Sequence, residues 1–357
     1  MQLAYNEIYP RNPRSTMILA IESTCDESGI ALVSRDNATS TRFTIEFNVV
    51  SSQVAKHTPF GGVVPRIAAR EHSKNFPILL DQLTSFLHSR GLQLNTIERI
   101  AYAHEPGLEP SLLIGANLAR SMAYFLDLPL QPVNHVFAHL FSPLIHDNAG
   151  DISVFKGQFP LVGLVVSGAH TRLYVLRSVT DWEIIGDTRD DAAGEAFDKI
   201  ARMLGFPYPG GPHIERVAHA GDPKKYPFPR GLIESGDYEF SFSGLKTSVR
   251  YMLRDLGFMT EGVTTQNTSL PDSLKADIAA SAQRAIIDIL VTKTLSAALE
   301  YNAKGVIIGG GVVANQAIIE QFRLAAEQMP EPLTIYVPDR QYATDNAAMI
   351  GVAALAL

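Results

Sequence analysis

Two stretches of the chain share one pattern of apolar and polar residues. Residues 17–33 read MILAIESTCDESGIALV, which is an apolar run, a polar turn and a second apolar run. Residues 161–176 read LVGLVVSGAHTRLYVL and repeat that order, with Ser167 standing 144 positions after Ser23. Short apolar runs that flank a polar turn predict β-hairpins. The echo therefore predicts two related lobes, each opened by a hairpin; the alternative is a coincidence between two common hairpin patterns.

Helical patterns separate these hairpins from further strand-like runs. The run VIIGGG (306–311) predicts a strand that ends in a glycine turn. Segment 205–242 holds six prolines and six glycines, which favours a surface loop over a cleft or a mobile lid. Strands that alternate with helices predict an α/β fold. Periodic or alanine-rich stretches predict helices at 66–90, 111–126, 192–204, 272–301, 314–328 and 345–357.

The length of 357 residues exceeds the usual size of one domain, which also favours two lobes. We predict an N-terminal extension over 1–16, lobe I over 17–134 and lobe II over 135–344, with helix 345–357 packed back on lobe I. Residues 1–16 are polar and lack the apolar centre of a secretory signal. A targeting peptide is the alternative to a plain extension.

Composition narrows the classes of function. Thirty basic residues against 37 acidic ones give a net charge of −7, which argues against a generic cationic coat for nucleic acid. A local exception is the segment after His57, where Arg66, Arg70 and Lys74 form a cationic helix face. That face either contacts RNA phosphates or is simply solvated. No apolar run approaches the roughly 20 residues of a membrane helix, so we expect a soluble protein.

The single cysteine, Cys25, excludes an internal disulfide and fits a reducing compartment. It stands beside Asp26 and Glu27, two acids whose charges would raise the pKa of a thiol. A nucleophilic cysteine is therefore disfavoured.

The segment HVFAH (135–139) offers the clearest candidate chemistry. It places His135 and His139 at i and i+4, on one face of a helix and close enough to share a metal ion. No glutamate follows the first histidine, so the base of a zinc protease is missing. Asp345, in ATDNAAM at a predicted helix start, is the candidate third ligand. Two histidines and one carboxylate suit zinc or ferrous iron; the alternative is a structural histidine pair.

Two further motifs sit at predicted helix starts in the second half. GGGVVAN (309–315) is a strand, glycine turn and helix whose amides can approach a phosphate or ribose, although it is not a Walker A motif. DDAAGEAFDK (190–199) places acids in a first helical turn, where they either cap the helix or, at Asp198, reach a ligand. Taken alone, each motif is also explained by local structure.

Taken together, these segments resemble one family. IESTCDESGIALV, HTPFGGVVPRIAAREH, NHVFAHL, VSGAHTRLY, DDAAGEAFDK with YPGGP, FSFSGLKTS, GGGVVAN and ATDNAAMIG occur in that order across residues 17–357. They resemble the tRNA N6-adenosine threonylcarbamoyltransferases, whose bacterial members are called TsaD and were formerly described as O-sialoglycoprotein endopeptidases. Ala169 stands where the family usually has a second glycine after Ser167.

The resemblance implies a two-lobed fold of the actin and Hsp70 ATPase type (ASKHA), with internal duplication and an interlobe cleft. It implies transfer of a threonylcarbamoyl group from threonylcarbamoyl-adenylate to N6 of adenosine 37, next to the anticodon, in tRNAs that read ANN codons. The products are AMP and the modified nucleoside t6A. By motif, the metal ligands would be His135, His139 and Asp345, holding one Fe²⁺ or Zn²⁺ per subunit. Asp26 and Glu27 are candidate catalytic groups for the proton of the attacking amine. The donor site maps to Val165, Val166, Ser167, Gly168, Ala169, Asp198, Gly211, Glu215 and Asn315.

Family members act with partners, so the resemblance also implies tRNA, a paralogous TsaB-like subunit and a small TsaE-like ATPase if the source is bacterial. A homodimer is a further candidate assembly. The expected location is the cytoplasm, with the mitochondrial matrix as the alternative. Two other readings stay open: a small-molecule carbamoyltransferase of the same fold, and a non-catalytic scaffold that binds nucleotide.

Overall fold

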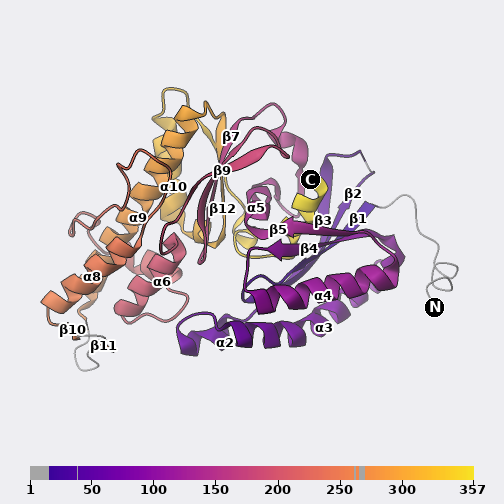
Figure 1. Ribbon diagram of the computed structural model, residues 1–357, viewed down its shortest axis with the longest axis horizontal. Helices are drawn as coiled ribbons and strands as arrows, with labels where there is room; N and C mark the ends of the chain where they lie inside the picture. Colours follow the sequence, from indigo (N-terminus) through magenta and orange to yellow (C-terminus); the bar gives the residue numbers. More distant parts are fainter. Residues whose placement is uncertain (1–15, 38, 261–262, 265–269) are drawn as a thin grey trace. The chain divides into compact units, whose positions relative to one another are not determined.

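The computed structural model describes residues 16–37, 39–260, 263–264 and 270–357 (Figure 1). The predicted extension over 1–16 lies outside these residues except for Thr16, where the first strand begins. The chain divides into two compact units. Unit 1 comprises residues up to Gly157 together with Pro338–Leu357, and unit 2 comprises Gln158–Val337.

Unit 1 is built on a six-stranded sheet in the order β5-β4-β1-β2-β3-β6. β1 runs parallel to β4, and β4 runs parallel to β5, whereas β2, β3 and β6 continue the sheet in antiparallel fashion. The strands are β1 (Thr16–Glu22), β2 (Glu27–Arg35), β3 (Arg42–Ser52), β4 (Ile97–Glu105), β5 (Leu130–Asn134) and β6 (Ala149–Asp151).

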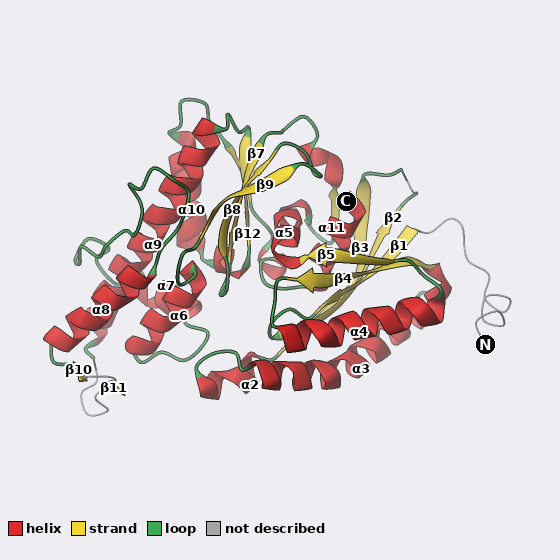
Figure 2. Cartoon of the chain, in the orientation of Figure 1, coloured by secondary structure: helices red, strands yellow, loops and turns green. Residues whose placement is uncertain are grey.

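Helices cover both faces of this sheet, because side chains of a strand alternate between its two faces. Leu19 and Ile21 of β1 belong to a core cluster with α3 and α4, which run beside one another in Figure 2. On the other face, Ala20 of β1 and Val33 of β2 lie against Gly351 of α11. The helices of unit 1 are α2 (Val54–His57), α3 (Pro65–Ser89), α4 (Glu109–Leu126), α5 (His135–Ala138) and α11 (Ala347–Ala356), with 3₁₀ turns at Thr58–Phe60, Leu94–Thr96, His139–Leu144, Ile152–Phe155 and Arg340–Tyr342.

Unit 2 repeats this topology on a five-stranded sheet in the order β13-β12-β7-β8-β9. β7 is parallel to β12 and antiparallel to β8. In the same way, β1 of unit 1 is parallel to β4 and antiparallel to β2. The predicted relation between the two hairpins therefore extends to five strands of each sheet. The strands are β7 (Leu161–Val166), β8 (Thr171–Leu176), β9 (Trp182–Asp187), β12 (Gly305–Gly309) and β13 (Thr334–Tyr336), with a separate pair β10 (Met259–Thr260) and β11 (Val263–Thr264).

The core of unit 2 lies between its sheet and a layer of helices. The long helix α9 supplies many of the buried side chains, and Val162, Leu164 and Val166 of β7 join them in one cluster. Segment 205–242, predicted as a loop or lid, contains a short helix, and Phe228 and Phe240 anchor it in that core. The helices are α6 (Ala193–Met203), α7 (Gly211–Ala218), α8 (Ser243–Asp255), α9 (Asp272–Glu300) and α10 (Gln316–Glu327), with a 3₁₀ turn at Gly311–Ala314.

The division between the units differs from the predicted boundary at residue 134. Residues 135–157 belong to unit 1 because β6 pairs with β3. The amide of Ile45 also donates to the carbonyl of Asn148 at 2.7 Å. The two histidines of HVFAH therefore lie in the same unit as Asp345. Among the described residues, no helix combines the length and the apolar character needed to cross a membrane.

A substitution at Gly310 tests the packing of the glycine turn in unit 2. Its φ of 95° is unfavourable for any residue with a Cβ, and a Cβ built there would stand 2.4 Å from the carbonyl oxygen of Val166. We expect Gly310→Ala to lower the free energy of unfolding by about 2 kcal/mol. Denaturant unfolding followed by the fluorescence of Trp182, the single tryptophan, measures this directly in unit 2.

The matched control is Gly244→Ala in α8, where an added Cβ meets nothing within 4 Å. A change of less than about 1 kcal/mol is expected there. Equal stability of the two variants would contradict the packing described for the glycine turn.

Candidate metal and donor site

The carboxyl ends of the parallel strands bring the polar groups of unit 1 together. β1 ends at Glu22, and β5 ends at Asn134, immediately before His135. Because β1, β4 and β5 run parallel, these ends lie at the same edge of the sheet. Asn134 caps the short helix α5 by accepting from the amide of Phe137 at 2.9 Å, which fixes the direction in which His135 leaves the strand.

Asp345 approaches the same edge from the C-terminal segment. Its neighbour Asn346 caps α11 by accepting from the amide of Met349 at 3.0 Å. The amide group of Asn346 also donates to the carbonyls of Tyr342 and Thr344, at 3.2 and 2.8 Å. This clamp holds the backbone on both sides of Asp345.

His135, His139 and Asp345 form one cluster. Each offers a ligand atom, and these atoms all lie within 4.8 Å of one another. Asp345 Oδ1 stands 3.6 Å from Nε2 of His135 and 3.2 Å from Nε2 of His139. The predicted i and i+4 spacing holds, although the chain passes from α-helix to a 3₁₀ turn at His139. This donor set fits a divalent metal such as zinc or ferrous iron.

His139 supports that fit independently. Its side chain is 1% exposed, and within the described residues neither ring nitrogen makes a hydrogen bond, although Nε2 has the close contact with Asp345 Oδ1. Buried polar atoms are rarely left without partners, so an unmatched imidazole points to a ligand. A metal ion bound at this cluster would satisfy it.

Glu22 is the residue that the sequence analysis missed. It is fully buried, and its Oε2 lies 2.9 Å from Nδ1 of His135. Burial by itself lowers the pKa of His135, but the charges of Glu22 and Asp345 outweigh it and raise that pKa to about 9. The sequence feature that could have identified Glu22 is its position as a carboxylate at the end of the apolar run of β1.

Asp26 and Glu27, the candidate catalytic groups, lie in the turn after β1 and at the start of β2. Burial, followed by the charges of Asp26 and Asp345, raises the pKa of Glu27 well above its ordinary value. Oδ2 of Asp26 is buried and has no hydrogen-bond partner among the described residues. The same causes, burial first and then Asp26, raise the pKa of Cys25, so its thiol stays protonated and unreactive.

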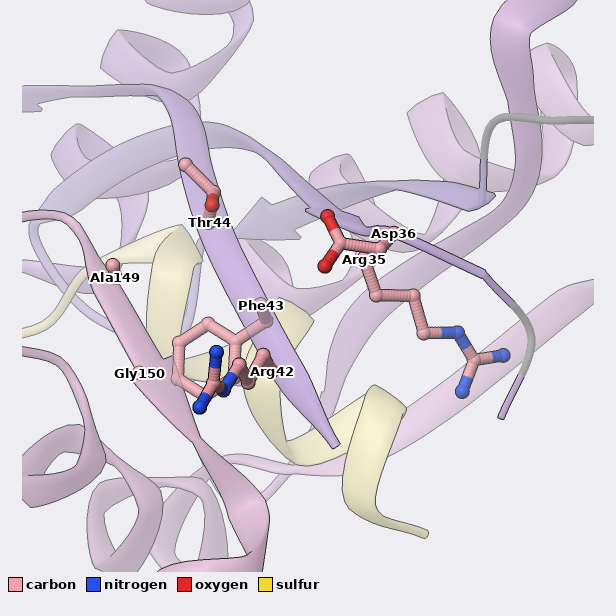
Figure 3. A pocket seen from close by; sticks show the side chains of 7 residues that line it. All are labelled: Arg35, Asp36, Arg42, Phe43, Thr44, Ala149 and Gly150. Carbon is pink, nitrogen blue, oxygen red and sulfur yellow. The ribbon is translucent and has the colours of Figure 1, made fainter. Parts of the chain in front are cut away.

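The cationic face expected on α3 is partly neutralised. Arg66, Arg70 and Lys74 are exposed, but Glu71 lies 2.6 Å from Nζ of Lys74 and 3.7 Å from Nε of Arg70. A separate pocket of unit 1 is shown in Figure 3. It lies at the end of β2 opposite to the turn after Glu22, and is lined by Arg35, Asp36, Arg42, Phe43, Thr44, Ala149 and Gly150.

The predicted donor residues all fall in unit 2. Val165 and Val166 are buried, so they present only backbone atoms, whereas Gly168 and Ala169 are exposed in the turn. Ser167 Oγ accepts from the amides of Ala169 and His170 at 3.3 and 3.0 Å. The glycine turn at Gly310 approaches Val166 closely, so the two turns are neighbours.

The other predicted donor residues each hold a piece of backbone. Asp198 Oδ1 accepts from the amide of Gly210 at 2.6 Å, which places the turn before Gly211. Glu215 Oε1 accepts from the amide of Gln316 at 2.8 Å. Asn315 caps α10 and donates to Gln283 Oε1 at 2.8 Å. The structure thus links helices α6, α7 and α10 through the side chains that the motifs singled out.

The comparisons with known proteins identify the family of the chain. Residues 44–352 match the family model of TsaD, tRNA N6-adenosine threonylcarbamoyltransferase. The chain belongs to the TsaD family. It is 43% identical over 339 residues to the tRNA N6-adenosine threonylcarbamoyltransferase of Moorella thermoacetica, covering 95% of this chain and 91% of the relative. Against the enzyme of the same name from Polaromonas naphthalenivorans it is 41% identical, covering 95% and 88%.

Two solved structures are similar to this chain in fold, at much lower sequence identity. HypF in the phosphate- and nucleotide-bound form matches 97% of this chain with a TM-score of 0.60 and 13% identity. HypF from T. kodakarensis matches 96% with a TM-score of 0.57 and 15% identity. This chain spans about half of each HypF chain, 47% in both cases. The α/β fold with two related sheets is therefore shared at low sequence identity.

Loss of any one ligand tests the metal cluster. We expect His135→Ala, His139→Ala and Asp345→Ala each to weaken Zn²⁺ binding by more than the roughly 10–100-fold that changes around metal ligands cost. Competition with a chromophoric chelator measures the affinity. His146→Ala is the control, because His146 is an exposed histidine of the same unit that contacts Asp339 at 3.1 Å. Equal affinity in all four variants would rule the cluster out.

Proposed function

We propose that this chain transfers the threonylcarbamoyl group of threonylcarbamoyl-adenylate to N6 of adenosine 37 in tRNAs that read ANN codons. AMP and t6A are the products. The observation that carries the proposal is the His135, His139 and Asp345 cluster, in a chain that belongs to the TsaD family over nearly its whole length.

The reaction is an acyl transfer to a weak nucleophile. N6 of the adenosine attacks the carbamoyl carbon, a C–N bond forms, and the bond from that carbon to the phosphate oxygen of AMP breaks. The amine loses one proton, and AMP departs with the electron pair of the broken bond. A divalent metal held by His135, His139 and Asp345 would supply Lewis-acid polarisation of the acyl group.

The residues of unit 1 suit the remaining tasks. Glu27 has a raised pKa and is the candidate base for the proton of the amine, with Asp26 beside it. Burial of His139 and Glu22 keeps water away from the charged groups, which strengthens every electrostatic interaction there. Positioning and polarisation would supply most of the acceleration, because the exocyclic amine is a poor nucleophile.

We assign the nucleotide part of the donor to the turns of unit 2. Gly168 and Ala169 expose their backbone in the turn, which lets a ligand approach closely. The amides of Ala169 and Gln316 already donate to Ser167 Oγ and Glu215 Oε1, so a phosphate at the start of α10 would have to compete with these side chains. Asp198 and Glu215 would act chiefly by holding the Gly210–Gly211 turn and the start of α10 in place.

Partners and location complete the proposal. The relatives named above come from bacteria, which supports a cytoplasmic enzyme acting with a TsaB-like paralogue and a TsaE-like ATPase. A composite surface would supply the positive charge that this chain, at −7, does not offer to RNA.

A transfer assay tests the activity. Purified protein is mixed with Zn²⁺ or Fe²⁺, synthetic threonylcarbamoyl-adenylate and unmodified tRNA, with and without the two partners, and nucleosides are analysed by mass spectrometry. We expect t6A from the native chain and at least a hundredfold less, on the order of one oxyanion-type interaction, from the His135→Ala, His139→Ala double variant. Full activity of that variant would contradict a role for the metal in the reaction. If the native chain forms no t6A yet binds metal and nucleotide, the small-molecule transferase or the scaffold becomes the better reading.

The pH profile tests Glu27. A base must be deprotonated to act, and the raised pKa keeps Glu27 protonated to higher pH than the ordinary value near 4.3. We therefore expect the single-turnover rate, measured at saturating metal, to fall as the pH drops through the pKa of Glu27 in the loaded enzyme, which a bound cation would lower from its metal-free position. Glu27→Gln should be slower by about 10²–10⁴-fold and should lose this acid limb. A Glu27→Gln profile that keeps both the rate and the limb would assign the proton to another group.

A further inference from the structure

Glu22 uses both of its carboxylate oxygens at the end of β1. Oε1 accepts from the amide of Thr24 at 2.7 Å, which closes the first step of the polar turn. Oε2 contacts Nδ1 of His135 at 2.9 Å. The carboxylate is fully buried, and a buried charge is retained only where its partners compensate for lost solvation. Each of the two carboxylate oxygens therefore has one contact that compensates for its lost solvation.

The contact decides which nitrogen of His135 is available. When the carboxylate of Glu22 accepts in this contact, Nδ1 of His135 carries the hydrogen. A metal then displaces the proton on Nε2, and the lone pair that it binds is on the nitrogen that faces Asp345 Oδ1 at 3.6 Å. Thr24 Oγ1 lies 3.3 and 3.4 Å from the two ring nitrogens, so it is nearly equidistant from both and does not select either one.

The two histidines of the cluster are therefore supported differently. His135 has an oriented and charged partner, whereas both ring nitrogens of His139 lack a hydrogen bond among the described residues. The polar contact given for the His139 ring is that of Nε2 with Asp345 Oδ1 at 3.2 Å, and its far nitrogen, Nδ1, has no counterpart to Glu22 among the described residues. Of the two, His135 is the histidine with a carboxylate on the nitrogen that faces away from Asp345.

We propose that Glu22 is a positioning residue that presents His135 as an Nε2 ligand, strengthens it as a donor and so sets the metal affinity of the cluster. A carboxylate that accepts from the far nitrogen of a metal-bound histidine fixes the ring and raises its basicity. The inference rests on the metal site of the proposed function, and assigns a role to a residue outside the ligand set.

Glutamine at position 22 separates this role from simple packing, because it has the same shape. Its carbonyl oxygen can accept either from the amide of Thr24 or from His135, but not from both in the geometry of the carboxylate. If the carbonyl faces Thr24, the NH₂ group faces Nδ1 and drives the hydrogen of His135 onto Nε2. If the carbonyl faces His135, the NH₂ group meets the amide of Thr24. Either arrangement weakens the ligand or opens the turn.

Zinc affinity in the full chain is the first measurement, by competition with a chromophoric chelator. We expect Glu22→Gln to bind Zn²⁺ about 10–100-fold more weakly than the native chain. Glu22→Asp keeps the charge but is one methylene shorter, so we expect it to be weakened as well. The control is Glu46→Gln in β3, a partly buried glutamate of the same sheet that accepts from Ser34 at 2.6 Å; its affinity should stay native. Native affinity in Glu22→Gln would overturn the proposal.

The second measurement does not need the variants to fold. In zinc-loaded native protein labelled with ¹⁵N-histidine, NMR identifies the nitrogen of His135 that carries the hydrogen. The proposal requires Nδ1–H and zinc at Nε2; zinc at Nδ1 would overturn it.

The outcomes also separate this inference from the proposed function. If neither the native chain nor the His135→Ala variant binds zinc specifically, the metal site itself fails, and the positioning role fails with it. If the native chain binds zinc and the ligand variants do not, the site stands, and the affinity of Glu22→Gln alone decides the role of Glu22.

Discussion

The site of unit 1 depends on the crowding of buried carboxylates around two histidines. Glu22, Asp26 and His139 are almost fully buried, and burial, followed by the charges of Asp26 and Asp345, raises the pKa of Glu27. Like charges at this density are unfavourable unless a cation, a proton or a hydrogen-bond donor compensates. The protein supplies two imidazoles and the amide of Thr24. A divalent cation would satisfy the unmatched His139 and reduce the repulsion among the acids at once, so metal binding and the stability of this edge of the sheet are expected to be linked.

Much of the fold could be predicted because its strands and helices carry strong periodic signals. The two hairpins and the six predicted helices correspond to elements of the structure, with small shifts at their ends. The helix Ser243–Asp255 was not predicted, since its sequence is polar and begins in a hydroxyl-rich segment. The unit boundary was misplaced because β6 has only three residues, Ala-Gly-Asp, without any apolar pattern. Its place in the first sheet comes from pairing with β3, which local sequence does not encode.

The candidate site also contains residues that the sequence predicts and residues that only the fold brings together. The metal cluster could be predicted because HxxxH spacing is local and Asp345 belongs to a recognisable motif. The contact of Glu22 with His135 could not be predicted, since 113 residues separate the two. The parallel order of β1, β4 and β5 brings them together. In unit 2 the motifs identified residues that matter to the fold in any case. Asp198 and Glu215 hold backbone amides, so substitutions there would disturb helix placement as well as any ligand.

The duplicated topology places different residues at matching ends of the two sheets. With Ser23 matched to Ser167, Glu22 at the end of β1 corresponds to Val166 at the end of β7, and both turns contain four residues before the next strand. In unit 1 that position is a buried carboxylate, and the turn continues with Asp26, so this edge of the sheet suits a cation. In unit 2 it is a valine whose carbonyl packs against Gly310, and the turn exposes the backbone of Gly168 and Ala169, which suits an anion. The strand order is the same in both sheets, so the difference in chemistry follows from a few side chains at the carboxyl ends of matching strands.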